Sequence, residues 1–166
     1  MKRRLAILLA GAAAALTISA VGAADSARRD SAGQKLLDRG RYLMKISGCN
    51  DCHTAGYAAS GGQVPEEKWL TGDALGWSGP WGTTYAANLR LVVAGLSEEE
   101  WVRRARSAQY RPPMPWFALR DMSEADLRAA YRYIRSLGAV GGPVPAYVPP
   151  GGKVAGPAVA FPMPPK

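Results

Sequence analysis

The chain has 166 residues, a formal net charge of +8 at pH 7 and 48% hydrophobic residues. This length corresponds to one domain with appendages, and the hydrophobic share excludes a chain that is disordered throughout. Nineteen glycines and thirteen prolines predict long irregular stretches between the regular elements.

The N-terminus has the pattern of an export signal. Basic residues at positions 2–4 precede an apolar stretch over residues 5–20, and small residues follow before Asp25. We therefore expect residues 1–24 to be a signal peptide and the mature protein to be periplasmic. The alternative is an uncleaved membrane anchor, because residues 5–24 are just long enough to span a bilayer. Nucleic acid is not an expected partner, because the chain is exported and has no recognition motif.

Three segments begin with a capping-box pattern. In this pattern the first side chain would accept from a backbone N–H at the start of a helix, and the second side chain would accept from the backbone N–H of the first residue. The pairs are Ser31 with Gln34, Ser97 with Glu100, and Ser123 with Asp126. The first segment runs to about Ile46, and the last is a strongly amphipathic helix that ends at Gly138. No segment alternates with period two, so the sequence predicts an all-α domain with long irregular loops.

The domain is predicted over residues 34–137, after an N-terminal lead at 25–33. Residues 54–96 have few periodic runs, and a loop of that length needs an organiser such as a bulky buried cofactor. The segment 138–166 is rich in glycine and proline. It predicts an extended, floppy tail that is pinned at most locally, or else a docking strap for a partner.

The two cysteines and the one histidine of the chain lie together in Cys49-Asn50-Asp51-Cys52-His53. This Cys-x-x-Cys-His spacing is the attachment signature of one c-type haem. Two thiols on one helical turn can each add to a porphyrin vinyl group, and His53 can then bind the iron as the fifth ligand.

Three other interpretations of the Cys-x-x-Cys-His motif are possible. A zinc site needs four ligands, and the chain has no other cysteine or histidine. A thioredoxin-like dithiol belongs in a βαβ setting, which the sequence lacks. A disulfide across two residues would be strained and would constrain almost nothing. Haem c is favoured over all three.

Met114 is the predicted sixth ligand of the iron. His53 is the only histidine, so ligation by two histidines of one chain is impossible and methionine remains the strong candidate. Met114 lies in the proline-rich stretch 111–116, where a stiff loop would support a weak iron–thioether bond. Its alternative role is core filler. The other four methionines lie in the signal, on a helix face, at a helix start and in the tail (Met1, Met44, Met122 and Met163).

Over about residues 34–137 the sequence resembles the class I monohaem cytochromes c. The Arg-Pro-Pro-Met-Pro-Trp stretch and the last helix look like the c-type cytochrome subunits that accompany bacterial periplasmic dehydrogenases. The resemblance implies a helical fold in which the first and last helices cross over one covalently bound haem. It also implies that Gly40 meets Tyr131 at this crossing, and that the second ring nitrogen of His53 donates to a backbone carbonyl near Pro65.

Haem propionates need hydrogen-bond donors, and the sequence offers two kinds. Arg90 or Arg111 could form a charge-assisted contact. Four tryptophans carry indole N–H groups that could serve, although each is as readily an ordinary core residue (Trp69, Trp77, Trp81 and Trp116).

The expected function is one-electron transfer between exported redox partners, such as a dehydrogenase and an oxidase, and not enzymatic catalysis. The alternatives are a haem enzyme or gas sensor with an open sixth site, which would be peroxidase-like, and a cytochrome subunit of a dehydrogenase complex. Four arginines before Met114 would steer an acidic partner to the haem edge or form a solvated face (Arg103, Arg104, Arg106 and Arg111). The membrane is a partner only if the signal is retained.

Overall fold

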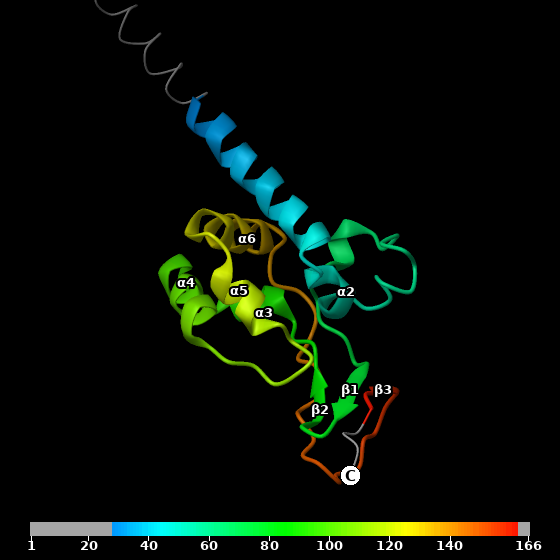
Figure 1. Cartoon of the computed structure of the whole chain (residues 1–166). Coiled ribbons are helices and arrows are strands. Elements are labelled where there is room, and N and C mark those ends of the chain that lie inside the picture. The colour runs from blue at the N-terminus through cyan, green and yellow to red at the C-terminus, as the bar shows by residue number, and fades with distance from the viewer. Residues whose placement is uncertain (1–27, 163–166) are drawn as a thin grey trace, which may run out of the picture. The chain divides into compact units, whose positions relative to one another are not determined.

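The structure is a computed structural model that describes residues 28–162 (Figure 1). The expected signal peptide and Met163 lie outside the described residues. The chain divides into two compact units, one ending at Leu36 and the other beginning at Leu37. Within the described part of the chain, no helix is long and apolar enough to cross a membrane.

The first described helix ends where the sequence predicts but begins earlier. Residues 28–46 are helical. The prediction that Ser31 caps this helix is therefore wrong, because Ser31 already lies inside it. The expected lead also carries helix over residues 28–33, so the capping-box pattern here is a chance match.

Besides residues 37–46 of the first helix, the second unit holds five α-helices and one 3-10 helix among its described residues. They are α2 (Cys49–His53), η1 (Glu66–Lys68), α3 (Leu89–Ala94), α4 (Glu98–Ser107), α5 (Trp116–Asp121) and α6 (Glu124–Ser136). The capping box of Ser97 and Glu100 at the start of α4 is confirmed. At the start of α6, the Ser123 side chain accepts from the backbone N–H of Asp126. Mostly helical structure is thus confirmed, while the expected loop over residues 54–96 contains η1, α3 and two strands.

Gly40 packs directly against α6. A Cβ added to Gly40 would lie 2.2 Å from the Ala129 carbonyl oxygen and 2.5 Å from Cβ of Tyr133. The sequence is therefore correct that Gly40 is a close-approach position, but wrong that its partner is Tyr131. The Tyr131 hydroxyl instead donates to the Leu96 carbonyl, 2.8 Å away. An ion pair between Arg39 and Asp126, at 2.7 Å, supports the same contact.

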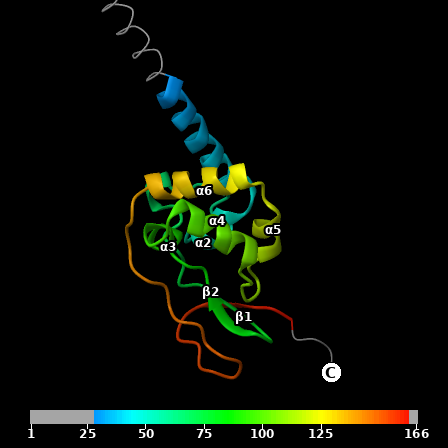
Figure 2. The ribbon, with the colours of Figure 1, turned by 90° about the vertical axis from the view of Figure 1, so that its left-hand side faces the viewer.

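A small sheet corrects the expectation of an all-α domain. Strands β1 (Gly76–Gly79) and β2 (Gly82–Tyr85) are antiparallel, and β3 (Ala158–Ala160) pairs parallel with β1, which gives the order β2-β1-β3. The glycine-rich strands are too short to show period-two alternation, and the third comes from the predicted tail. Figure 2 shows the C-terminal segment passing along this hairpin.

The segment after α6 is therefore a strap on its own sheet, and the predicted floppy tail is wrong over its described residues. Val148 forms an antiparallel bridge with Thr83. The ring of Phe161 lies 5.3 Å from that of Trp81, and its backbone N–H donates to Ser78. Tyr147, Val148 and Phe161 thus all contact the hairpin.

The core of the second unit lies between the first helix, α3, α4 and α6. Its buried side chains include Met44, which is 2% exposed. Others are Leu70, Val93, Leu127 and Ile134. The indole of Trp101 donates to the Leu127 carbonyl at 2.9 Å, which joins α4 to α6.

Candidate haem-binding site

Helix α2 places the two thiols and the imidazole on one helical turn, as the motif predicts. Gly48 precedes it with a φ of 71°, a left-handed conformation that glycine adopts without strain. Cys49 and Cys52 are both free and partly exposed. Burial raises the pKa of Cys49 to about 11 and also raises the pKa of Cys52. Such thiols differ from the low-pKa thiols of disulfide oxidoreductases.

His53 is held in one orientation by a backbone carbonyl. Its ring is 9% exposed, and Nδ1 donates to the carbonyl oxygen of Ala87 at 2.7 Å. Burial lowers the pKa of His53, although the hydrogen bond to Ala87 opposes this, so the ring is neutral. Nε2 then carries the lone pair, and no residue within 28–162 hydrogen-bonds to it.

The acceptor for His53 is a correction to the sequence prediction. A carbonyl was expected, but near Pro65, whereas the structure uses Ala87. An alanine carbonyl has no side-chain signature. The one sequence feature near this acceptor is Asn88, which caps α3 by accepting from the backbone N–H groups of Arg90 and Leu91. Because Ala87 directly precedes this cap, the start of α3 positions the Ala87 carbonyl.

Asn50, inside the motif, ties α2 to the chain that follows. It is fully buried, and its Oδ1 accepts from the Thr54 hydroxyl at 2.8 Å. The Thr54 oxygen in turn accepts from the backbone N–H of Leu70, also at 2.8 Å. Among described side chains, Asn50 Nδ2 is the one buried polar atom without a hydrogen-bond partner. The hydrogen bonds of Asn50 and Thr54 therefore tie the end of α2 to Leu70.

Met114 lies on a different element from the other three predicted site residues. It is half-buried in the connection between α4 and α5, and its carbonyl accepts from Trp116 at 2.9 Å. Two residues earlier, the Pro112 carbonyl accepts from the Thr84 hydroxyl at 2.8 Å. Thr84 belongs to β2, just before the Ala87 acceptor of His53. One stretch of backbone thus anchors both His53 and the loop that bears Met114.

The guanidinium of Arg90, a candidate partner for a haem propionate, already has backbone partners. The side chain is 5% exposed, and its guanidinium donates to the carbonyls of Gly138 at 2.6 Å and Glu67 at 2.8 Å, and to that of Leu137. The contacts with Leu137 and Gly138 cap the end of α6, and the contact with Glu67 ties Arg90 to η1. A propionate contact by Arg90 would have to break them. Arg111 instead lies over the ring of Tyr147.

The candidate indole donors divide into two pairs. The N–H groups of Trp69 and Trp81 are used by the backbone, at Val64 and Trp77. Those of Trp77 and Trp116 have no hydrogen-bond acceptor among the described residues. Trp77 and Trp116 therefore each keep an indole N–H that is available to hydrogen-bond a bound group.

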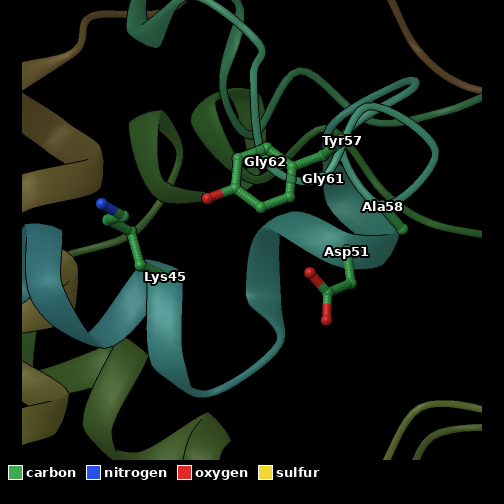
Figure 3. Close-up of a pocket in the computed structure, with 6 residues that line it drawn as sticks. All are labelled: Lys45, Asp51, Tyr57, Ala58, Gly61 and Gly62. Atoms are coloured by element: carbon green, nitrogen blue, oxygen red, sulfur yellow. The ribbon is translucent and has the colours of Figure 1, made fainter.

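A shallow hollow of about 430 Å³ lies beside α2 (Figure 3). Lys45 and Asp51 line it together with the loop residues Tyr57, Ala58, Gly61 and Gly62. Neither cysteine nor His53 lines it, so the hollow is separate from the haem-attachment residues.

The residues present fit a covalently bound haem better than the other interpretations of the motif. Two free thiols lie one turn apart beside an imidazole with an unpaired Nε2, which is the donor set that haem c requires. Within residues 28–162, no group of three or more histidine, cysteine, aspartate or glutamate side chains could hold a metal ion, which disfavours zinc.

Comparisons with known proteins agree with this site. Neither the curated proteins nor the solved structures include a match to the chain. The family model described as cytochrome c matches residues 32–138, which is more than half of the sequence and includes every predicted ligand. The family implies haem c and supports a haem-based electron carrier, and the chain belongs to the cytochrome c family.

Proposed function

We propose that this cytochrome c carries single electrons with an iron bound axially by His53 and Met114. The observation that carries the proposal is the hydrogen bond from His53 Nδ1 to Ala87, which holds Nε2 ready beside two free thiols. When bound, the haem supplies a reversible one-electron couple. A carbonyl acceptor on the far side of the imidazole raises its basicity as a ligand.

The chain's own residues favour a closed centre. His53 keeps its orientation because α2 is bonded at Asn50 and Thr54. Met114 is presented by a loop with prolines on both sides and a bond from β2. With His53 and Met114 both holding the iron, electron transfer would need little rearrangement of the protein. A filled sixth position also leaves no site for peroxide or a gas, which argues for a carrier instead of an enzyme.

The sixth ligand is tested by paired substitutions in the matured protein. Met114→Leu should remove the methionine-to-ferric charge-transfer band and allow carbon monoxide to bind the reduced form, because leucine offers no donor atom. Met122→Leu, at another half-buried methionine, should keep the band. A high-spin wild-type spectrum with a ready carbon monoxide adduct would contradict the carrier and favour a sensor or peroxidase.

We also propose an acidic redox partner. Arg103, Arg104 and Arg106 are exposed on α4, and Arg111 is exposed on the following loop. Exposed charges steer encounters over about one Debye length, ~8 Å at physiological salt. The rate of electron transfer to the partner should therefore fall as ionic strength rises. A flat profile would contradict the steering.

We also propose that the protein is exported. Residues 1–24 would direct the chain to the periplasm, where a dehydrogenase or oxidase would be its partner. N-terminal sequencing of the matured protein should begin near Asp25. An intact Met1 would indicate a retained anchor, and co-purification with a dehydrogenase would indicate a complex subunit.

A further inference from the structure

Tyr147 and Val148 pack closely against β2. Val148 exchanges two backbone hydrogen bonds with Thr83, at 2.8 and 3.0 Å. A Cβ added to the neighbouring Gly82 would lie 2.3 Å from the Val148 carbonyl oxygen and 3.0 Å from the Tyr147 hydroxyl. The two tail residues therefore occupy space that only a glycine at position 82 leaves free.

Tyr147 contacts both the hairpin and the loop that bears Met114. Its hydroxyl donates to the Trp81 carbonyl at 2.8 Å. The guanidinium of Arg111 lies 3.9 Å from the centre of the Tyr147 ring, which is within cation–π range. Because the Tyr147 hydroxyl is hydrogen-bonded to the hairpin, the ring is held in the orientation in which it contacts Arg111.

The loop just before Met114 is thus contacted at two successive residues, through the side chain of Arg111 and the carbonyl of Pro112. The tail holds Arg111 through Tyr147, and β2 holds Pro112 through Thr84, at 2.8 Å. Met114 follows after one further proline. The iron–thioether bond is weak, so its occupancy depends on how well the protein preorganises the loop.

We propose that the C-terminal segment 143–152 is a clamp that positions Met114, with Tyr147 and Arg111 as its positioning residues. The clamp rests on the proposed His53–Met114 ligation. Loss of the clamp raises the fraction of ferric protein in which Met114 is off the iron. A competing ligand binds only that fraction, so its apparent affinity rises in the same proportion.

The test is imidazole titration of the ferric holoprotein, followed by loss of the methionine-to-iron band. Tyr147→Ala removes the cation–π contact and the hydroxyl bond, and it should strengthen apparent imidazole binding about tenfold. Tyr147→Phe keeps the ring and should strengthen it by only about threefold. Tyr110→Ala is the matched control, because Tyr110 is 39% exposed against 37% for Tyr147 and has no ring partner among the described residues.

Two truncations separate positioning from general stability. Removal of residues 153–166 deletes β3 and Phe161 but keeps Tyr147, so imidazole affinity should stay within about twofold of wild type. Removal of residues 143–166 should raise it at least as much as Tyr147→Ala. Denaturant unfolding of each variant is measured in parallel, because a merely structural tail would lower stability in both truncations and leave imidazole affinity unchanged.

The outcomes distinguish the two proposals. A wild-type spectrum without the methionine band overturns the ligation by Met114, and the clamp with it. A wild-type protein that has the band, with unchanged imidazole affinity in Tyr147→Ala and in the longer truncation, overturns the clamp alone. Arg111→Lys should keep more of the wild-type behaviour than Arg111→Gln, since lysine retains the cation.

Discussion

Substitution of Gly40 by alanine tests the contact between the first helix and α6. The added methyl would lie 2.2 Å from the Ala129 carbonyl oxygen and 2.5 Å from Cβ of Tyr133. Neither atom is the end of a flexible side chain, so the helices must move apart by about 1 Å to restore ordinary van der Waals distances. Overpacking of this kind costs about 3 kcal/mol. The better helix propensity of alanine returns about 1 kcal/mol.

The expected net loss is therefore about 2 kcal/mol, or a fall of about 8 °C in Tm for a domain of this size. The measurement is thermal unfolding of the haem-loaded protein by circular dichroism. Gly33→Ala is the matched control, because Gly33 is also helical and a Cβ there meets nothing within 4 Å. It should be neutral or stabilising by up to about 1 kcal/mol. Equal effects of the two substitutions would refute the close contact.

Two further predictions concern the charged side chains Arg90 and Glu98. Arg90→Met should lower the free energy of unfolding by about 2–4 kcal/mol, because three backbone carbonyls lose a charged donor. Urea unfolding measures this loss. A loss below about 1 kcal/mol would contradict the prediction. Burial raises the pKa of Glu98, but hydrogen bonds from Arg132 and Arg128 outweigh it, and the pKa lies below its usual range. This stabilisation is present above the unfolded pKa and is lost as pH falls through the folded value. Glu98→Gln should therefore destabilise at pH 7 and progressively less as the pH falls through the folded pKa of Glu98, and a penalty independent of pH would contradict the ion pairs.

The features that were predictable from sequence depend on neighbouring residues. The cap at Ser97 and the helix start at Ser123 each need a side chain and a backbone N–H three residues away. The attachment motif likewise lies within five residues, so its placement on one turn of α2 follows from the spacing. Even so, Ser31 shows that a local pattern can occur inside a helix without starting it.

The features that were missed depend on residues far apart in the chain. The carbonyl that orients His53 comes from Ala87, 34 residues later, and any residue could provide it. An arginine suits a haem propionate and the end of a helix equally well, and the sequence alone did not show that Arg90 caps α6. The β1–β2 hairpin was missed because its strands are too short to show alternation, and the third strand was missed because β3 pairs with β1 from far along the chain.

The exposure of the strap also affects how the native protein opens. The β1–β2 hairpin closes a short loop, whereas the Tyr147 contact with Trp81 joins residues 66 positions apart and costs more chain entropy to close. The strap's residues are mostly exposed, and the contacts of exposed segments open at low free energy. We therefore expect local opening in native-state hydrogen exchange to begin where the chain after α6 closes over the hairpin.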